Sequence, residues 1–177
     1  MSVARTESDK LHVEVDVDEV TGAPTASSII KNLFFSWKTN GPACLICDES
    51  PQNKILIDYI TSHGMETQLI GTTVFYKRYG AFVDIDWGMV ILCIDAFDGV
   101  GRVFNKLRYF RDERPHIPLI LTSANFKSDD VTQERLAICD LSMKLPLDPA
   151  QLDNLFEAAG LNNVAWSKRS LEYMIGC

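Results

Sequence analysis

Short apolar runs alternate along the chain with segments in which apolar residues recur at helical spacing. The strongest runs are ACLIC at residues 43–47, MVILCI at 89–94 and IPLILT at 117–122. Continuous apolar runs of this length are typical of parallel strands that are covered on both faces. Weaker strands are predicted at residues 67–70 and 141–144.

Helices are predicted between and after these strands. They cover residues 48–64, a short segment ending near residue 80, residues 99–112, residues 129–138 and a last segment around residues 152–159. Strands that alternate with helices favour βαβ crossovers, which build a parallel sheet with helices on both faces. The pattern therefore predicts an α/β domain.

The chain divides into an N-terminal extension (residues 1–41), a central domain (42–160) and a C-terminal tail (161–177). In the extension, valines alternate with acidic residues over HVEVDVDEV at residues 12–20, which indicates an edge strand or an acidic arm. A helical stripe follows, formed by Ile29, Ile30, Leu33, Phe34 and Trp37. We expect this stripe to form a homodimer interface, and packing on its own domain is the alternative.

Composition narrows the function classes. The net charge of −7 argues against direct nucleic-acid binding. No apolar run approaches the ~20 residues of a membrane span, and residues 1–10 lack the apolar core of a secretion signal. We therefore expect a cytoplasmic protein with no membrane contact. Cys44 and Cys47 form a C-x-x-C spacing, but a strand points them to opposite faces, which indicates buried thiols rather than a redox pair or half a zinc site.

Polar residues stand where several of the predicted strands end. Asp48 and Glu49 follow the first strand, Asp95 follows MVILCI, Thr122 ends IPLILT, and Lys144 ends the last strand. In parallel sheets, ligands bind beyond the carboxyl ends of the strands. We expect these side chains to converge on one rim.

Three segments carry a family resemblance. They are LICDESPQNKILIDYI, MVILCIDAFDGVGRVFNKLRYFRDERPHIPLILTSA and MKLPLDPAQLDNLF. In this order they resemble the receiver domain of response regulators in two-component signalling, over about residues 42–160. The resemblance implies a flavodoxin-like, doubly wound sheet of five parallel strands in the order 2-1-3-4-5, preceded here by the N-terminal helical extension.

The resemblance also implies a chemistry for the rim. Asp95 would accept a phosphoryl group, and Asp48 and Glu49 would hold Mg²⁺ with it. Thr122 and Lys144 would bind the phosphoryl group. A metal suits this role, because a carboxylate attacks an anionic donor poorly unless the charge is neutralised. The implied partner is a histidine kinase or phosphotransfer protein, and no enzyme activity is expected beyond self-phosphorylation and autodephosphorylation.

The chain also departs from the family pattern. Only Ala96 and Phe97 separate Asp95 from the Asp-Gly that follows, and Leu145 separates Lys144 from Pro146. A shift of one residue along a strand turns a side chain to the other face, unless a bulge or a cis peptide restores it. The aromatic residue expected on the last strand is missing. The alternative is therefore a degenerate receiver that acts as a protein-interaction module without phosphorylation.

Two other classes, a phosphatase and a flavin-binding protein, fit the sequence less well. Asp84-Ile85-Asp86 is similar to the Asp-x-Asp of haloacid-dehalogenase-like phosphatases, but here it precedes an apolar strand instead of following one. A flavin-binding protein would need a loop rich in glycine and hydroxyl groups after the first strand, and ESPQNK lacks one.

Overall fold

Five parallel strands form one sheet in the computed structural model, which describes residues 26–48 and 50–175. The strands are β1 (Ala43–Ile46), β2 (Thr67–Ile70), β3 (Met89–Cys93), β4 (Leu119–Ser123) and β5 (Leu141–Lys144). Their order is β2-β1-β3-β4-β5, so the predicted flavodoxin-like α/β fold is confirmed.

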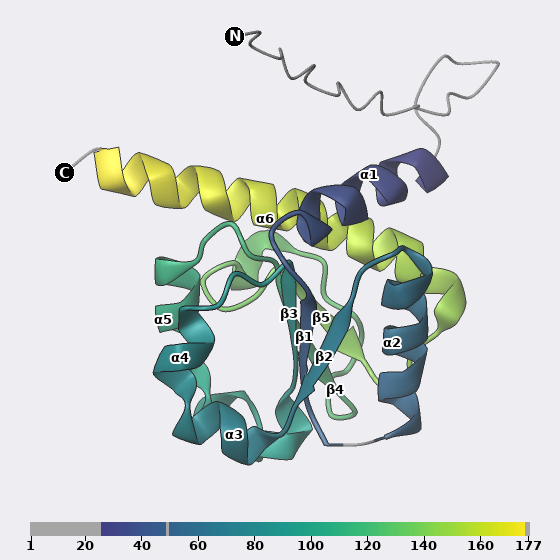
Figure 1. The fold of residues 1–177 in the computed structure, drawn as a ribbon, viewed down its shortest axis with the longest axis horizontal. Helices are drawn as coiled ribbons and strands as arrows, with labels where there is room; N and C mark the ends of the chain where they lie inside the picture. The colour runs from purple at the N-terminus through teal and green to yellow at the C-terminus, as the bar shows by residue number, and fades with distance from the viewer. Residues whose placement is uncertain (1–25, 49, 176–177) are drawn as a thin grey trace, which may run out of the picture.

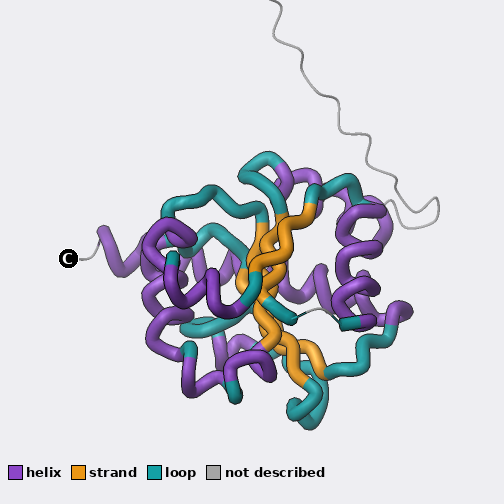
Figure 2. The backbone as a smooth tube through the Cα atoms, turned by 60° about the horizontal axis from the view of Figure 1, so that its bottom comes forward, coloured by secondary structure: helices purple, strands orange, loops and turns teal. Residues whose placement is uncertain are grey.

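Helices cover both faces of this sheet (Figures 1 and 2). The α-helices are α1 (Ala26–Lys38), α2 (Pro51–Ser62), α3 (Thr72–Lys77), α4 (Tyr79–Val83), α5 (Phe104–Glu113) and α6 (Leu152–Ile175). Short 3-10 turns are η1 (Ile94–Phe97), η2 (Val100–Arg102), η3 (Gln133–Arg135) and η4 (Pro149–Gln151). One core lies between the sheet and α1, α2 and α6, and a second lies under α3, α4 and α5.

Alternation along β1 divides its side chains between the two cores. Leu45 and Cys47 lie in the core beneath α1, α2 and α6, while Cys44 and Ile46 lie in the other. Both cysteines are buried free thiols, as predicted. Burial raises the pKa of Cys47 to about 12, with nearby Cys93 and Asp48 adding to the shift. Burial also raises the pKa of Cys44, so neither thiol is poised as a thiolate.

Helix α1 packs on its own domain. Ile30, Phe34 and Trp37 are buried in the core shared with α2 and α6. The Phe34 ring lies 5.3 Å from the ring of Phe156 on α6, measured between centroids. The predicted homodimer interface is therefore wrong for these three residues, because their apolar surface is already covered within the chain. Ile29 is half-buried, and Leu33 packs against the same core. Homodimer formation itself stays a prediction.

Helix α6 passes through the predicted boundary at residue 160 and continues to Ile175. Residues 161–175 are thus part of a helix rather than a separate tail. Side chains beyond the boundary hold this part of the helix to the domain: Asn162 Nδ2 donates to the carbonyl of Asp140 at 2.8 Å, and Ser167 Oγ donates to that of Pro115 at 2.9 Å. These contacts explain why α6 continues beyond residues 152–159, the segment in which the sequence predicts the last helix.

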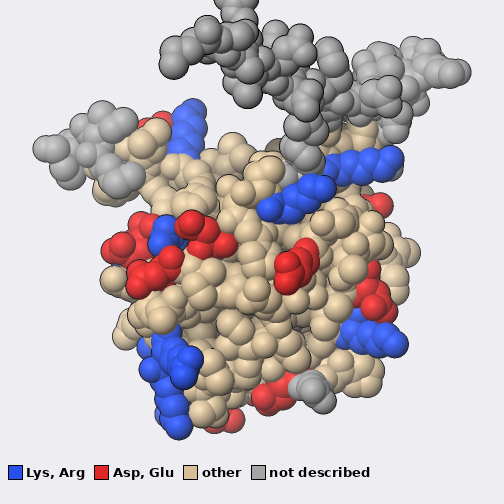
Figure 3. All heavy atoms as spheres, viewed as in Figure 1, with Lys and Arg blue, Asp and Glu red and all other residues tan. Residues whose placement is uncertain are grey.

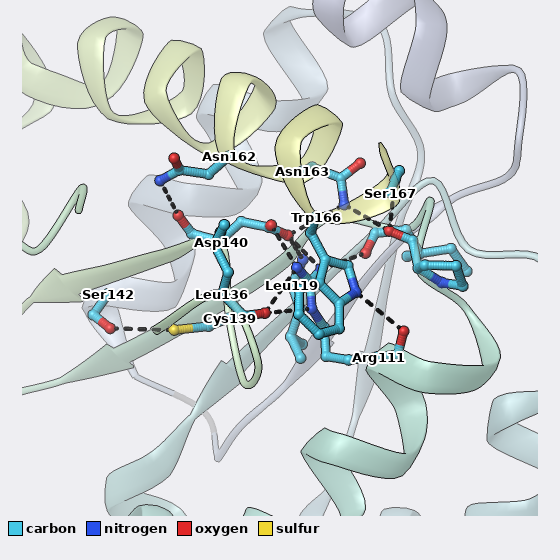
Figure 4. Close-up of polar contacts among 12 residues, drawn as sticks. Arg111, Leu119, Leu136, Cys139, Asp140, Ser142, Asn162, Asn163, Trp166 and Ser167 are labelled. Atoms are coloured by element: carbon cyan, nitrogen blue, oxygen red, sulfur yellow. Dashed lines mark hydrogen bonds and ion pairs between the residues drawn. The ribbon is translucent and has the colours of Figure 1, made fainter. Parts of the chain in front are cut away.

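A buried ion pair joins α5 to the start of β5 (Figure 4). Arg111 donates from Nη1 and Nη2 to the two carboxylate oxygens of Asp140, both at 2.8 Å, and both side chains are fully buried. Asp140 also accepts from the backbone N–H of Leu119 at 2.8 Å and from Asn163 Nδ2 at 3.3 Å. The ion pair therefore links α5, α6, β4 and β5.

The predicted helix at residues 129–138 is wrong, since this segment forms the 3-10 turn η3 and an isolated antiparallel bridge between Asp130 and Ser142. Its acidic side chains bind nearby backbone instead. Asp130 Oδ1 accepts from the N–H and Oγ1 of Thr132, and Asp129 Oδ1 accepts from the N–H of Lys144. Side chains that bind backbone groups in this way compete with helix formation.

Some predictions fall outside the described residues. These are the acidic segment at residues 12–20 and Glu49. Within residues 26–48 and 50–175, no helix combines the length and apolar character needed to cross a membrane.

Candidate functional site

A pocket of about 530 Å³ lies beyond the carboxyl ends of β1 and β3. Residues from four segments line it: Asp48, Ser50, Gln52, Asn53, Cys93, Asp95, Ala96, Ala124, Leu145 and Pro146. This is the edge at which parallel sheets bind ligands. The structure therefore brings Asp48 and Asp95 together on one rim, as predicted.

The start of α2 shapes one wall of the pocket. Ser50 caps the helix, because its Oγ accepts from the N–H of Asn53 at 3.3 Å, and Pro51 occupies the first turn. Asn53 Nδ2 donates to the backbone carbonyl of Asp48. Gln52 Oε1 accepts from the N–H of Leu147 at 2.9 Å, which ties this wall to the loop after β5.

Asp95 lies in η1, directly after β3, and its carboxylate is held by neutral donors. Oδ1 accepts from Ser123 Oγ at 2.5 Å and from Asn125 Nδ2 at 3.1 Å, while Oδ2 accepts from the N–H of Ala124 at 2.7 Å. Partial burial raises the pKa of this carboxyl, but the three donors outweigh burial and hold the pKa below its usual range.

The hydroxyl beside Asp95 belongs to Ser123, one residue after the predicted Thr122. Thr122 is buried, pairs in register with Cys93, and is not among the residues that line the pocket. Ser123 and Asn125 were missed by sequence reasoning. The segment LTSAN offers two successive hydroxyls, and placing the strand end one residue later would have selected the second.

Lys144 is not among the residues that line the pocket. Its Nζ donates to the backbone carbonyl of Lys127 at 3.1 Å, and its side chain is exposed. Leu145 and Pro146, joined by a cis peptide bond, line the pocket instead. The position facing Asp95 from the end of β5 therefore carries an apolar side chain where the resemblance implies a cation.

The rim can be tested against the ligands that Mg²⁺ needs. Asp48 and Asp95 are the acidic residues that line the pocket within the described part of the chain. Among those residues, no group of three or more His, Cys, Asp or Glu side chains could hold a metal ion. Both oxygens of Asp95 already accept hydrogen bonds. The described part of the rim thus supplies two of the three predicted carboxylates, Asp48 and Asp95. Because Glu49 lies outside the described residues, the predicted magnesium site stays a prediction.

The fold and the rim together define a flavodoxin-like α/β protein with an acidic pocket at the carboxyl ends of its strands. No protein-family model matches the chain, and no curated protein matches it. The receiver resemblance consequently rests on the sequence segments quoted above.

Proposed function

We propose that this protein is a receiver-like signalling module of the cytoplasm that binds partner proteins without being phosphorylated. One observation carries the proposal: both oxygens of the Asp95 carboxylate accept hydrogen bonds from neutral donors, and Leu145 faces the same pocket.

Phosphoryl transfer to a carboxylate brings two anions together. The reaction needs cationic groups at the site to neutralise the incoming charge. Ser123, Ala124 and Asn125 stabilise the negative charge of Asp95 but carry no charge of their own. They lower the basicity of the carboxylate, and with it the reactivity of the oxygens toward a donor; Oδ1 accepts two of these hydrogen bonds and Oδ2 accepts one. This arrangement suits a structural anchor for the loop after β4 better than a nucleophile.

The rival hypothesis is a phosphoacceptor that uses Mg²⁺ and a histidine kinase or phosphotransfer protein. The shared pocket of Asp48 and Asp95 favours it. In that case Asp95 would react through Oδ2, which accepts one hydrogen bond from the described residues, and Mg²⁺ would have to supply the positive charge.

Incubation with acetyl phosphate and Mg²⁺, followed by intact-mass measurement, separates the two hypotheses. We expect no phosphoryl adduct under conditions that label an authentic receiver domain run in parallel. A labile adduct that Asp95→Asn removes would contradict the proposal and support the rival. Asp98→Asn is the matched control, since Asp98 is exposed and does not line the pocket.

A further inference from the structure

A second concave site of about 490 Å³ lies between α5 and the C-terminal half of α6. Its lining is formed by Arg108, Asp112, Trp166, Arg169, Ser170 and Tyr173. None of these residues lines the pocket at Asp95. We call this site the α5–α6 groove.

The indole of Trp166 contacts Arg111, the arginine of the buried ion pair. Trp166 Nε1 donates to the backbone carbonyl of Arg111 at 3.2 Å, and the Arg111 guanidinium carbon lies 4.9 Å from the centre of the indole ring. Figure 4 shows Trp166 beside Arg111, which is itself fixed by two hydrogen bonds to Asp140. An aromatic side chain fixed in this way loses little freedom when a ligand binds.

The rest of the helix wall is also anchored. Ser167 Oγ donates to the carbonyl of Pro115, and Arg169 Nη2 donates to Gln133 Oε1 at 3.1 Å. Tyr173 is 81% exposed, so its ring is available for contact. The helix wall of the groove is therefore anchored by side-chain hydrogen bonds and ends in an accessible aromatic ring.

The groove residues are of the types that dominate protein interfaces. Trp, Tyr and Arg are enriched among residues that contribute most to binding energy. Two guanidiniums, from Arg108 and Arg169, outnumber the single carboxylate of Asp112, so the lining is net positive although the whole chain carries −7. Arginine binds carboxylates through paired hydrogen bonds, while the indole and phenol rings favour an apolar side chain.

We infer that the α5–α6 groove binds an acidic segment of a partner protein, with an apolar side chain against Trp166 and Tyr173 and carboxylates at Arg108 and Arg169. Asp112 offers an acceptor for a backbone N–H of that segment. The inference rests on the proposed interaction role and names the surface and the partner chemistry. A nucleic acid fits less well, because Asp112 repels phosphates and the lining supplies only two cations.

Intrinsic fluorescence provides a direct readout of the groove. Of the three tryptophans, Trp37 and Trp87 are buried, at 5% and 1% exposure, and Trp166 is half-buried in the groove. The probe is a fluorescein-labelled twelve-residue peptide in which Glu alternates with Leu; an unlabelled copy serves for the fluorescence titration. We expect a saturable change in tryptophan emission for the full chain. Trp166→Phe should remove that change, while anisotropy of the labelled peptide still reports binding.

Charge reversal supplies the matched control. Arg108→Glu with Arg169→Glu should raise the dissociation constant at least tenfold. Lys54→Glu with Lys127→Glu makes the same net change at exposed lysines outside the groove, and should alter it less than twofold. Equal effects of the two pairs would overturn the inference. So would the absence of saturable binding, or tighter binding of a single-stranded DNA 20-mer than of the peptide.

The same samples, incubated with acetyl phosphate and Mg²⁺, separate failure of the groove from failure of the proposed function. An unmodified protein that does not bind the peptide overturns the groove alone. A phosphoryl adduct on Asp95 with peptide binding retained overturns the proposed function and leaves the groove standing.

Discussion

Replacing Arg111 with methionine tests whether the buried ion pair determines how tightly α5 and α6 are joined. Methionine keeps much of the apolar stem and removes the guanidinium. The variant leaves the Asp140 carboxylate buried, with donors from Leu119 and Asn163 but without its counter-charge. Breaking a fully buried pair from one side costs about 3–5 kcal/mol, because the remaining charge is uncompensated. We expect the free energy of unfolding to fall by that amount at pH 8.

The cost should depend on pH in a defined direction. Burial raises the pKa of the Asp140 carboxyl, and Arg111 is among the groups that oppose this shift. Without Arg111, the folded-state pKa should lie further above the unfolded value of about 4. Below the unfolded value the carboxyl is neutral in both states, and the penalty develops as pH rises through the window between the two values. Arg111→Met should therefore be less destabilising at pH 5 than at pH 8.

Urea denaturation followed by far-ultraviolet circular dichroism measures both effects. Arg135→Met is the matched control, because Arg135 pairs with Asp130 at 3.0 Å while 46% of the arginine side chain is exposed. An exposed pair contributes about 0–1 kcal/mol. Asp140→Ala and the double variant Arg111→Met with Asp140→Ala complete a double-mutant cycle. The double variant should lose less unfolding free energy than the two single variants combined. If Arg111→Met and Arg135→Met cost the same, burial does not govern the strength of this pair.

Two further predictions concern Asp95 and α1. Asp95→Ala should lower the free energy of unfolding by about 1–3 kcal/mol at pH 7, because it removes a charged acceptor of three hydrogen bonds at a partly exposed site. Because the folded-state pKa of Asp95 is depressed, the ionised carboxylate stabilises the fold above the unfolded pKa, and this stabilisation disappears as pH falls through the folded pKa. Urea titrations of Asp95→Ala and the native protein at pH 7 and in acid check this dependence. An equal loss of unfolding free energy at both pH values would contradict it. Phe34→Ala should lower the free energy of unfolding by about 3–5 kcal/mol, because the ring is fully buried. The control is Leu161→Ala, at a residue that is 66% exposed, which should change the free energy of unfolding by less than about 0.5 kcal/mol in the same assay.

The fold could be predicted because its strands carry a strong local signal. The runs that form β1 and β3 are apolar throughout, and β4 is apolar until Thr122, since helices cover both faces of the sheet. Longer-range packing left no such signal. The burial of Phe34 depends on Phe156, more than a hundred residues away, and the path of α6 beyond residue 160 depends on polar contacts to Pro115 and Asp140.

The site shows how a shift of one residue changes a functional interpretation. Apolar runs indicate where a strand lies, but the last residue of each strand decides which side chain faces the rim. At the end of β4 the shift replaces Thr122 with Ser123, so a hydroxyl is retained beside Asp95. After β5 the shift replaces Lys144 with Leu145, so the cation is lost. The two shifts are therefore unequal in their chemical effect. Among the described residues, the pocket keeps the groups that hold a carboxylate, but no lysine or arginine lines it to neutralise a phosphoryl donor. This difference is our reason for proposing a binding role rather than phosphotransfer.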